Sequence, residues 1–240
     1  WPETSKDLLV PLGIGENREL WYRSLARMPH ALIGGATRAG KSTIMHAWIT
    51  ALALKNDPGT LRMCLVDLKG GTELTRYQRL PHMVDGELFG LKGDKADEIE
   101  GFVKEPKGVI PLLVAVRNEM DKRLRRFERA GGIQNISIWN YRRRANKLPR
   151  VVIFFDELNV LMLDSGYKGK AQDLLSDIGA RGAAPGMHLV LATQSPRTAV
   201  VPPLVKSNID TRLAFRVPDN PSSMVILDTT EAAKFDDNTP

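Results

Sequence analysis

The sequence predicts an α/β domain with a mostly parallel sheet and helices on both faces. Three observations predict this class. A glycine-rich loop stands between an apolar run and a helical pattern, several short apolar runs end in polar residues, and amphipathic helical stretches separate those runs. With 240 residues and 42% hydrophobic content, the chain can bury a full core, and its length suits one domain better than two.

We expect residues 1–28 to be a lead-in, residues 29–218 the core, and residues 219–240 an acidic, incomplete C-terminal segment. Within the lead-in, residues 8–13 (LLVPLG) fit an edge strand that ends in a turn. The chain begins at Trp1 without methionine and ends in polar residues, so it is expected to be a fragment of a longer protein. Its apolar runs are shorter than a membrane span, and any membrane anchor is expected outside it. The single cysteine, Cys64, offers no disulfide or zinc framework, which fits a reducing, cytosolic setting.

Residues 29–33 form a short apolar run directly before GGATRAGKST at residues 34–43. The glycines and the Gly-Lys-Ser ending of this stretch match the phosphate-loop pattern. Backbone N–H groups would turn inward around two phosphates, Lys41 would reach the β- and γ-phosphates, and Ser42 would offer a hydroxyl to Mg²⁺. The predicted site binds a nucleoside triphosphate. Its residues are Gly35, Ala36, Thr37, Arg38, Ala39, Gly40, Lys41, Ser42 and Thr43.

The next predicted strand, residues 61–67 (LRMCLVD), closes in Asp67, with Lys69 and a glycine pair just beyond it. Ligands of open α/β sheets bind at the carboxyl edge, so Asp67 has two interpretations that stay open. It belongs to the site, or it caps the next helix. Residues 85–108 are polar and predict a loop with one short helix.

Apolar residues recur at three- and four-residue steps from Leu113 to Phe127, which predicts an amphipathic helix that stops at the glycine pair 131–132. Residues 117–150 contain eleven Lys or Arg and three acids, and this balance of +8 exceeds the net charge of +6 for the whole chain. A solvated, partly paired surface explains most of these charges. The segment is also the candidate surface for a polyanionic partner.

A buried strand is predicted at residues 151–155, directly before Asp156 and Glu157. With the phosphate loop upstream, this pair suits hydrolysis of a nucleoside triphosphate. Asp156 is predicted to hold Mg²⁺ together with Ser42, and Glu157 is predicted to orient and polarise the attacking water.

Another strand is predicted at residues 188–192 and leads into Thr193 and Gln194. Gln194 is either a sensor of the γ-phosphate that orients water or an ordinary turn residue. A lone histidine such as His188 is more often structural than catalytic. Residues 211–217 predict the last strand.

Taken together, these motifs make the chain similar to the motor domain of the FtsK/SpoIIIE family of DNA-translocating ATPases. The resemblance covers almost the whole sequence. It rests on VPLG near residue 10, MPHALIGGATRAGKST at the loop, LVDLKGG at the second strand, LPH at residues 80–82, NEMDKRLRRFERAGGIQNISIWN from residue 118, FFDEL from residue 154, and the stretches GMHLVLATQSP and VKSNIDTRLAFRV.

The resemblance implies a RecA-like P-loop fold, ATP and Mg²⁺ as cofactors, assembly into a ring that is usually hexameric, and ATP-driven movement of double-stranded DNA. It also implies that an arginine of one subunit completes the ATP site of the next. Arg123 is the first candidate for this arginine and Arg181 the second. The family's usual closing segment is missing or diverged here, and Met224 stands where the family has an arginine.

Three functions stay open on the sequence alone. The chain is a DNA translocase of chromosome segregation or conjugative transfer, a type VII-like protein-secretion ATPase, or a nucleotide-binding scaffold without turnover. Intact Lys41, Asp156 and Glu157 argue against the scaffold. The basic segment favours DNA, although contacts between subunits also use arginine. By contrast, LVDLKGG is more similar to the secretion and conjugation branches. A motor of this kind is expected in the cytoplasm, with the full-length protein anchored at the inner face of the cell membrane.

Overall fold

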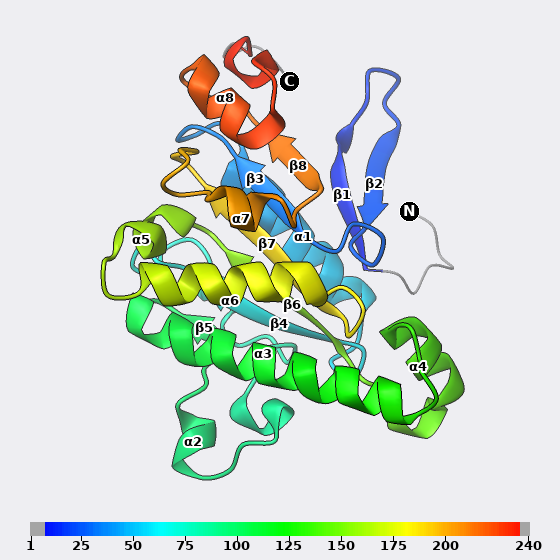
Figure 1. The fold of residues 1–240 in the computed structure, drawn as a ribbon. Coiled ribbons are helices and arrows are strands. Elements are labelled where there is room, and N and C mark those ends of the chain that lie inside the picture. Colours follow the sequence, from blue (N-terminus) through cyan, green and yellow to red (C-terminus); the bar gives the residue numbers. More distant parts are fainter. Residues whose placement is uncertain (1–7, 236–240) are drawn as a thin grey trace.

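The computed structural model describes residues 8–235, except for the side chain of Lys95. Its main sheet is entirely parallel, with the strand order β5-β4-β6-β7-β3-β8 (Figure 1). These strands are β3 (Ala31–Gly34), β4 (Leu61–Val66), β5 (Phe102–Val103), β6 (Arg150–Phe155), β7 (Met187–Thr193) and β8 (Thr211–Ala214). The predicted α/β class with a mostly parallel sheet is confirmed.

Helices cover both faces of this sheet. On one face, α3 and α6 lie side by side, and α1 lies on the other face (Figure 1). The helices are α1 (Lys41–Lys55), α2 (Asp94–Asp97), α3 (Pro106–Arg129), α4 (Ile136–Arg142), α5 (Leu158–Leu163), α6 (Lys168–Arg181), α7 (Pro203–Lys206) and α8 (Asn220–Leu227). Short 3₁₀ turns are η1 (Thr75–Tyr77), η2 (Gly86–Phe89), η3 (Arg144–Asn146) and η4 (Glu231–Ala233).

The central strand β6 shows how the sheet divides the core. Ile153 and Phe155 point into the apolar layer under α3 and α6, whereas Val152 and Phe154 point into the layer under α1. Because successive side chains of a strand face opposite sides, a strand buried on both faces reads as a continuous apolar run. Each large apolar side chain buried in this way stabilises the fold by about 1.5–3 kcal/mol.

The strand order decides which polar residues meet. Since β7 lies between β3 and β6, the segment after β7 comes between the loop that follows β3 and the acids that follow β6. The register pairs Gly34 with Thr193, and Phe155 with Leu191. All three strands end at the same edge of the sheet, which we call the carboxyl edge.

The predicted edge strand at residues 8–13 corresponds to β1 (Leu9–Ile14), but it does not join the main sheet. It pairs antiparallel with β2 (Leu20–Ser24), an exposed strand without a clear sequence pattern. The base of this hairpin packs on α1, where the Trp48 Nε1–H donates to the Pro11 carbonyl at 2.6 Å. Residues 1–7 of the predicted lead-in lie outside the described residues.

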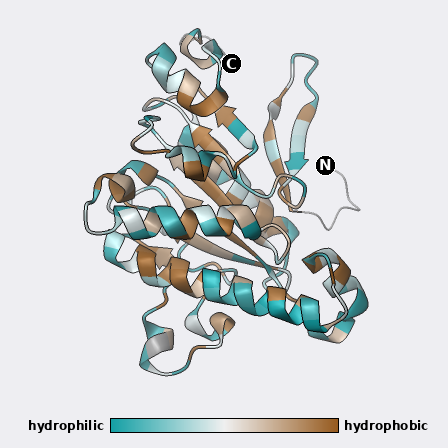
Figure 2. Ribbon diagram, in the orientation of Figure 1, coloured by the Kyte–Doolittle hydropathy of each residue, from teal (hydrophilic) through white to brown (hydrophobic). Residues whose placement is uncertain are grey.

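Helix α3 is longer than its apolar period predicts. It begins at Pro106, a residue that suits a first helical turn because its missing N–H needs no partner there. The predicted stop is confirmed, since the helix ends at Arg129 and Gly131 and Gly132 both have positive φ. The amino-terminal half of α3 is hydrophobic and its C-terminal half hydrophilic (Figure 2).

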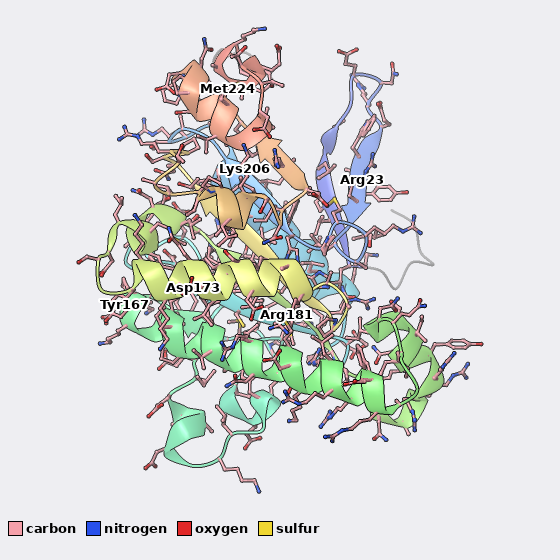
Figure 3. The ribbon with its side chains drawn as sticks, viewed as in Figure 1. Arg23, Tyr167, Asp173, Arg181, Lys206 and Met224 are labelled. Carbon is pink, nitrogen blue, oxygen red and sulfur yellow. The ribbon has the colours of Figure 1, made fainter. Side chains whose placement is uncertain are left out.

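The C-terminal segment packs against the core as far as the structure describes it. Ile226 of α8 is fully buried, and its side chain fills the space that a Cβ on Gly34 would need. Met224, at the position where an arginine was expected, is exposed on the outer side of α8 (Figure 3). Residues 236–240, the end of the predicted acidic segment, lie outside the described residues. The division of the chain into lead-in, core and acidic segment stays a prediction. Within residues 8–235, no helix combines the length and the apolar character needed to cross a bilayer.

Candidate nucleotide site

The phosphate-loop sequence forms a loop between β3 and α1, at the carboxyl edge. Gly40 has φ 107°, and a Cβ on Gly35 would lie 2.8 Å from the Cβ of Phe215, so the backbone conformation and the packing both require glycine. Among the described residues, the backbone N–H groups of Thr37, Arg38 and Gly40 donate to no protein acceptor. Unpaired N–H groups before a helix N-terminus suit a phosphate.

Lys41, the first residue of α1, reaches across to the acid after β6. Its Nζ donates to the Asp156 carbonyl at 3.1 Å and lies 3.2 Å from Asp156 Oδ1. Both side chains are almost fully buried. Burial lowers the pKa of the Lys41 ammonium from its ordinary value, and the carboxylate of Asp156 partly offsets this. An ion pair thus joins two residues that lie 115 positions apart in the sequence.

Glu157 is held by the end of β7. Its Oε1 accepts from the Thr193 hydroxyl at 2.9 Å, and its Oε2 accepts from the Gln194 backbone N–H at 3.2 Å. The side chain of Gln194 turns the other way, and its Oε1 accepts from the Thr37 hydroxyl of the phosphate loop at 3.1 Å. Gln194 therefore connects the phosphate loop to the acidic pair. The structure brings Lys41, Asp156, Glu157 and Gln194 together, as the sequence predicted.

The side chain of Asp67 binds the backbone of the segment that follows β4. Its Oδ2 accepts from the backbone N–H groups of Glu73 and Leu74 at 2.9 and 2.8 Å, and its Oδ1 accepts from that of Lys69 at 3.2 Å. Asp67 thus shapes its own loop and is not the N-cap of the next helical element, η1, whose N-cap residue is Leu74. The loop instead sends Lys69 to the site, with Nζ 3.2 Å from Asp156 Oδ2.

The oxygen ligands of this site fit Mg²⁺. Asp156 Oδ2 is buried and has the Lys69 ammonium beside it, and Ser42 stands half-buried at the start of α1. Carboxylate and hydroxyl oxygens are the ligands that this hard cation prefers.

Arg123, the first candidate for the completing arginine, is buried inside its own chain, which argues against contact with a neighbouring subunit. Its exposed fraction is 0%. Inside its own chain, Nε donates to Glu119 Oε1 at 2.9 Å, and Nη1 donates to the carbonyls of Pro149 and Pro185 at 2.7 and 3.0 Å. Burial lowers the pKa of this guanidinium, an effect that Glu119 opposes. Arg123 ties α3 to the segments that lead into β6 and β7.

Arg181, the second candidate, lies at the C-terminal end of α6 beside α3 (Figure 3). Its guanidinium binds Asp177 at 2.6 Å and Asp121 at 2.8 Å, and these hydrogen bonds raise its pKa. The side chain is 43% exposed. Arg181 precedes β7 whereas Gln194 follows it, so the length of the strand puts Arg181 roughly 20 Å from the site of its own chain. Its role in a neighbour's site stays a prediction.

Seven of the eleven basic residues in the predicted segment are exposed near the opposite edge of the sheet, the amino edge, where β6 begins. Arg143 and Arg144 lie over the rings of Trp139 and Tyr141, at 5.7 and 5.9 Å from the ring centroids. We call this cluster the basic surface. Its members are exposed and form no ion pair within residues 8–235: Arg125, Arg126, Arg129, Arg142, Arg143, Arg144 and Lys147.

His188 is structural, in line with the sequence interpretation. Its Nδ1 lies 3.0 Å from the Pro29 carbonyl, and burial lowers its pKa to about 3. It sits near the start of β7, at the edge of the sheet away from the phosphate loop.

Sequence reasoning placed Lys69 at the carboxyl edge but missed its contact with Asp156. The only signal is its position two residues after Asp67, at the end of a strand, because the contact depends on β4 and β6 being neighbours. It also missed the hydrogen bond of Thr37 to Gln194.

The fold and the site define a P-loop ATPase domain of the RecA-like kind, in which one strand separates the phosphate-loop strand from the acidic strand. A model of the FtsK/SpoIIIE family matches residues 1–142. The chain belongs to the FtsK/SpoIIIE family.

Relatives of the chain include DNA translocase SpoIIIE of Bacillus subtilis, 32% identical over 237 residues, which is 95% of this chain and 28% of the relative. DNA translocase FtsK of Lactococcus lactis is 32% identical over 240 residues, or 96% of this chain and 29% of the relative. The chain thus spans less than a third of the length of these translocases.

Two solved structures share the fold. The pCW3 conjugation coupling protein TcpA, in its monomer form with ATPγS, matches with a TM-score of 0.78 and 22% identity, over 100% of this chain and 64% of that one. The cytoplasmic domain of the type VII secretion ATPase EccC of Thermomonospora curvata matches with a TM-score of 0.74 and 22% identity, over 96% of this chain and 26% of that one.

Proposed function

We propose that this chain is the motor domain of an ATP-hydrolysing translocase that moves double-stranded DNA as a ring-shaped oligomer. The observation that carries the proposal is the meeting of Lys41, Asp156, Glu157 and Gln194 beside a loop with unpaired N–H groups. This combination offers groups for the phosphates, for a metal ion and for a water molecule at one place.

Each of these side chains has a distinct task in the proposed reaction. Lys41 moves from Asp156 to the β- and γ-phosphates, and Ser42 and Asp156 hold Mg²⁺. When bound there, Mg²⁺ would supply positive charge against the phosphate oxygens. Glu157 orients and polarises the attacking water, because Thr193 and the Gln194 N–H fix its carboxylate. Gln194, which already contacts Thr37 of the phosphate loop, senses the γ-phosphate.

Two observations support DNA as the substrate. Relatives named DNA translocases are 32% identical over 95% or more of this chain. The basic surface offers seven cationic side chains without ion pairs in the described part of the chain, two of them lying over aromatic rings. Lys and Arg side chains of this kind bind phosphate backbones without regard to base sequence.

In the proposed ring, Arg181 completes the ATP site of the next subunit. It lies at the edge of the sheet opposite its own phosphate loop, where a head-to-tail neighbour can use it. A mixture of Arg181→Ala subunits with Glu157→Gln subunits tests this role. We expect ATPase activity to return only in the mixture, since the intact site of one variant then receives the arginine of the other. Full activity of Arg181→Ala alone would remove Arg181 from this role.

The alternative is a type VII-like protein-secretion ATPase. The segment LVDLKGG is more similar to the secretion and conjugation branches than to the chromosome-segregation branch, so it suits this alternative and conjugative DNA transfer equally. The motor is proposed to act in the cytoplasm, with a membrane anchor or further domains elsewhere in the full-length protein.

The deciding experiment is the ATPase rate with and without linear double-stranded DNA, together with the salt dependence of DNA binding. We expect stimulation by DNA and an affinity that falls steeply with salt. If DNA neither stimulates hydrolysis nor binds with salt sensitivity, the DNA translocase is wrong and the secretion ATPase is favoured.

A pair of double variants locates the DNA-binding surface. Arg142→Ala with Arg144→Ala removes two charges from the basic surface, and Arg76→Ala with Arg79→Ala removes two exposed charges elsewhere. We expect the slope of log affinity against log salt to become shallower by about 0.9 for each phosphate that the protein no longer neutralises, in the first double variant only. An equal change in both would show that the basic surface has no special part in binding.

A further inference from the structure

Lys69 brings a second ammonium group to the acidic pair. Its Nζ lies 3.2 Å from Asp156 Oδ2 and 3.7 Å from Glu157 Oε2. The side chain is 24% exposed, but the ammonium nitrogen itself is buried. Lys69 comes from the loop after β4, so this ammonium group lies outside the phosphate loop that supplies Lys41.

The two carboxylates and two ammonium groups form a closed set. Lys41 takes Asp156 Oδ1, and Lys69 takes Asp156 Oδ2. Both oxygens of the proposed metal ligand therefore face a lysine, and the formal charges of the four side chains cancel. A buried acidic pair needs such partners, because an unpaired buried charge is strongly unfavourable.

The loop that carries Lys69 is fixed at both ends and has two glycines between them. Asp67 holds the backbone N–H of Lys69 at one end and the N–H groups of Glu73 and Leu74 at the other. Gly70 and Gly71, with φ of 79° and 73°, lie in the left-handed region. The backbone N–H of Lys69 is thus held by Asp67, and the flexible four-carbon side chain can redirect its ammonium group by rotation about its own bonds.

We propose that Lys69 occupies the cation position at Asp156 in the ligand-free site and withdraws from it when a divalent cation is bound. This inference rests on the proposed function, which gives Asp156 to Mg²⁺. Lys69 and a divalent cation repel each other at the same buried oxygen, so the two compete for it. Lys69 is a positioning residue whose ammonium group neutralises the acidic pair when no divalent cation is bound. Through Lys69, binding of the cation changes the conformation of the loop at residues 67–74.

The loop and the 3₁₀ turn η1 that follows it also contact the outer side of the phosphate-loop helix. Glu73 Oε2 lies 3.8 Å from His46 Nε2 of α1, and the Tyr77 hydroxyl lies 3.1 Å from His46 Nδ1. A movement of the loop caused by withdrawal of Lys69 can therefore reach α1 through the contacts of His46.

The test is the Mg²⁺ concentration that gives half-maximal binding of ATPγS, measured on the 240-residue chain with Lys69→Met, Lys69→Arg and Lys104→Met. Lys104 is the matched control, because its side chain packs on Gly71 of the same loop without an ion pair to Asp156. We expect Lys69→Met to need at least about threefold less Mg²⁺ than the unchanged chain, since the competing cation is gone. Lys69→Arg and Lys104→Met should match the unchanged chain.

The outcomes separate this inference from the proposed function. If Mg²⁺ promotes ATPγS binding but Lys69→Met needs as much Mg²⁺ as the unchanged chain, the competition is wrong and the proposed function stands. If the unchanged chain binds ATPγS without any dependence on Mg²⁺, the metal site and this inference both fail.

A second measurement needs no substitution and holds even if a variant fails to fold. Trypsin cleaves after a lysine whose side chain it can bind. The Lys69–Gly70 bond should therefore become a better substrate when the buried Lys69 ammonium withdraws from Asp156. We expect cleavage at the Lys69–Gly70 bond to be faster with Mg²⁺ and ATPγS than with ATPγS and a chelator. Mass spectrometry of the released peptide ends measures the rate at this bond. Equal or slower cleavage would overturn the withdrawal of Lys69.

Discussion

The two edges of the main sheet use charged residues differently. At the carboxyl edge, Lys41, Lys69, Asp156 and Glu157 come from three separate segments of the chain and pair with one another. At the amino edge, the arginines of α3, α4 and α6 either bind groups of nearby elements, as Arg123 does, or face solvent.

This difference separates catalysis from stability. The charges at the carboxyl edge are mutually neutralised and ready to exchange partners for phosphates and a metal ion. Arg123 is equally buried but has a carboxylate and two carbonyls of its own chain as permanent partners. Substitutions at the carboxyl edge should therefore change nucleotide chemistry, and substitution of Arg123 should change folding stability.

Lys41→Ala should have the largest effect. Loss of the ammonium removes the cation for the β- and γ-phosphates, so we expect ATP hydrolysis to fall by about 100- to 1,000-fold and ATP binding to weaken. ATPase assays and nucleotide binding by fluorescence measure both. A chain that keeps its thermal melt and still hydrolyses ATP at the original rate would contradict the whole assignment of the carboxyl edge.

Glu157→Gln should separate binding from hydrolysis. The amide keeps the size of the side chain and accepts from the Thr193 hydroxyl, but it cannot take a proton from water, so hydrolysis should fall by about 100-fold or more. ATP binding should persist, because Lys41 and the loop are unchanged. Isolation of the variant with unhydrolysed ATP after incubation checks this. Unchanged hydrolysis would remove Glu157 from its role.

Arg123→Met should act on stability alone. It removes the buried hydrogen-bonded partner of Glu119, whose other oxygen lies 3.5 Å from the Lys122 ammonium, and frees the carbonyls of Pro149 and Pro185. This loss should reduce the free energy of unfolding by about 3–5 kcal/mol. Arg125→Met, an exposed change two residues along the same helix, should have little effect and serves as the control. Denaturant unfolding of both variants measures the difference.

The kinetic result from Arg123→Met sharpens the same comparison. Where the variant remains folded at low temperature, its ATPase rate per folded chain should stay close to that of the unchanged chain. A stable Arg123→Met chain whose hydrolysis is lost, and is restored by mixing with Glu157→Gln subunits, would restore Arg123 as the completing arginine.

The sequence predicted the carboxyl edge well because each strand there has the same local pattern. The apolar runs before Asp67, Asp156 and Thr193 identify the strands, and the strands' parallel arrangement brings the residues after them to one edge. Contacts between those residues could not be predicted, because they depend on strand order. The pairing of Lys69 with Asp156 needs β4 beside β6, which no local pattern contains.

The sequence held a warning against Arg123 as the completing arginine. It lies three residues after Met120 and four before Phe127, on the same buried stripe of α3. An arginine on such a stripe needs acceptors inside the fold, and Glu119 four residues earlier supplies one. The carbonyls of Pro149 and Pro185 come from distant segments and have no signal in the local pattern. Strand β2 was missed because its residues are mostly exposed and lack an apolar alternation.

The smallest predicted effect is a pH dependence of folding stability that comes from two buried histidines at the amino edge of the sheet. His30 and His188 stand at the starts of β3 and β7, and the Leu189 N–H donates to His30 Nδ1 at 3.1 Å. Burial lowers the pKa of His30 to about 4, against a rise caused by Asp210, and that of His188 to about 3, with further lowering by His30 and Arg150.

Because both folded pKa values lie below the ordinary value of 6.5, the unfolded chain binds protons that the folded chain does not. Stability should therefore be complete above pH 6.5 and decline as the pH falls toward 4, on the order of 2 kcal/mol per histidine between pH 7 and 5. Unfolding of the unchanged chain and of a His30→Asn, His188→Asn double variant across this range measures the decline, and the double variant should show a flatter dependence. If stability falls equally with pH in the unchanged chain and in the double variant, groups other than His30 and His188 cause the acid sensitivity.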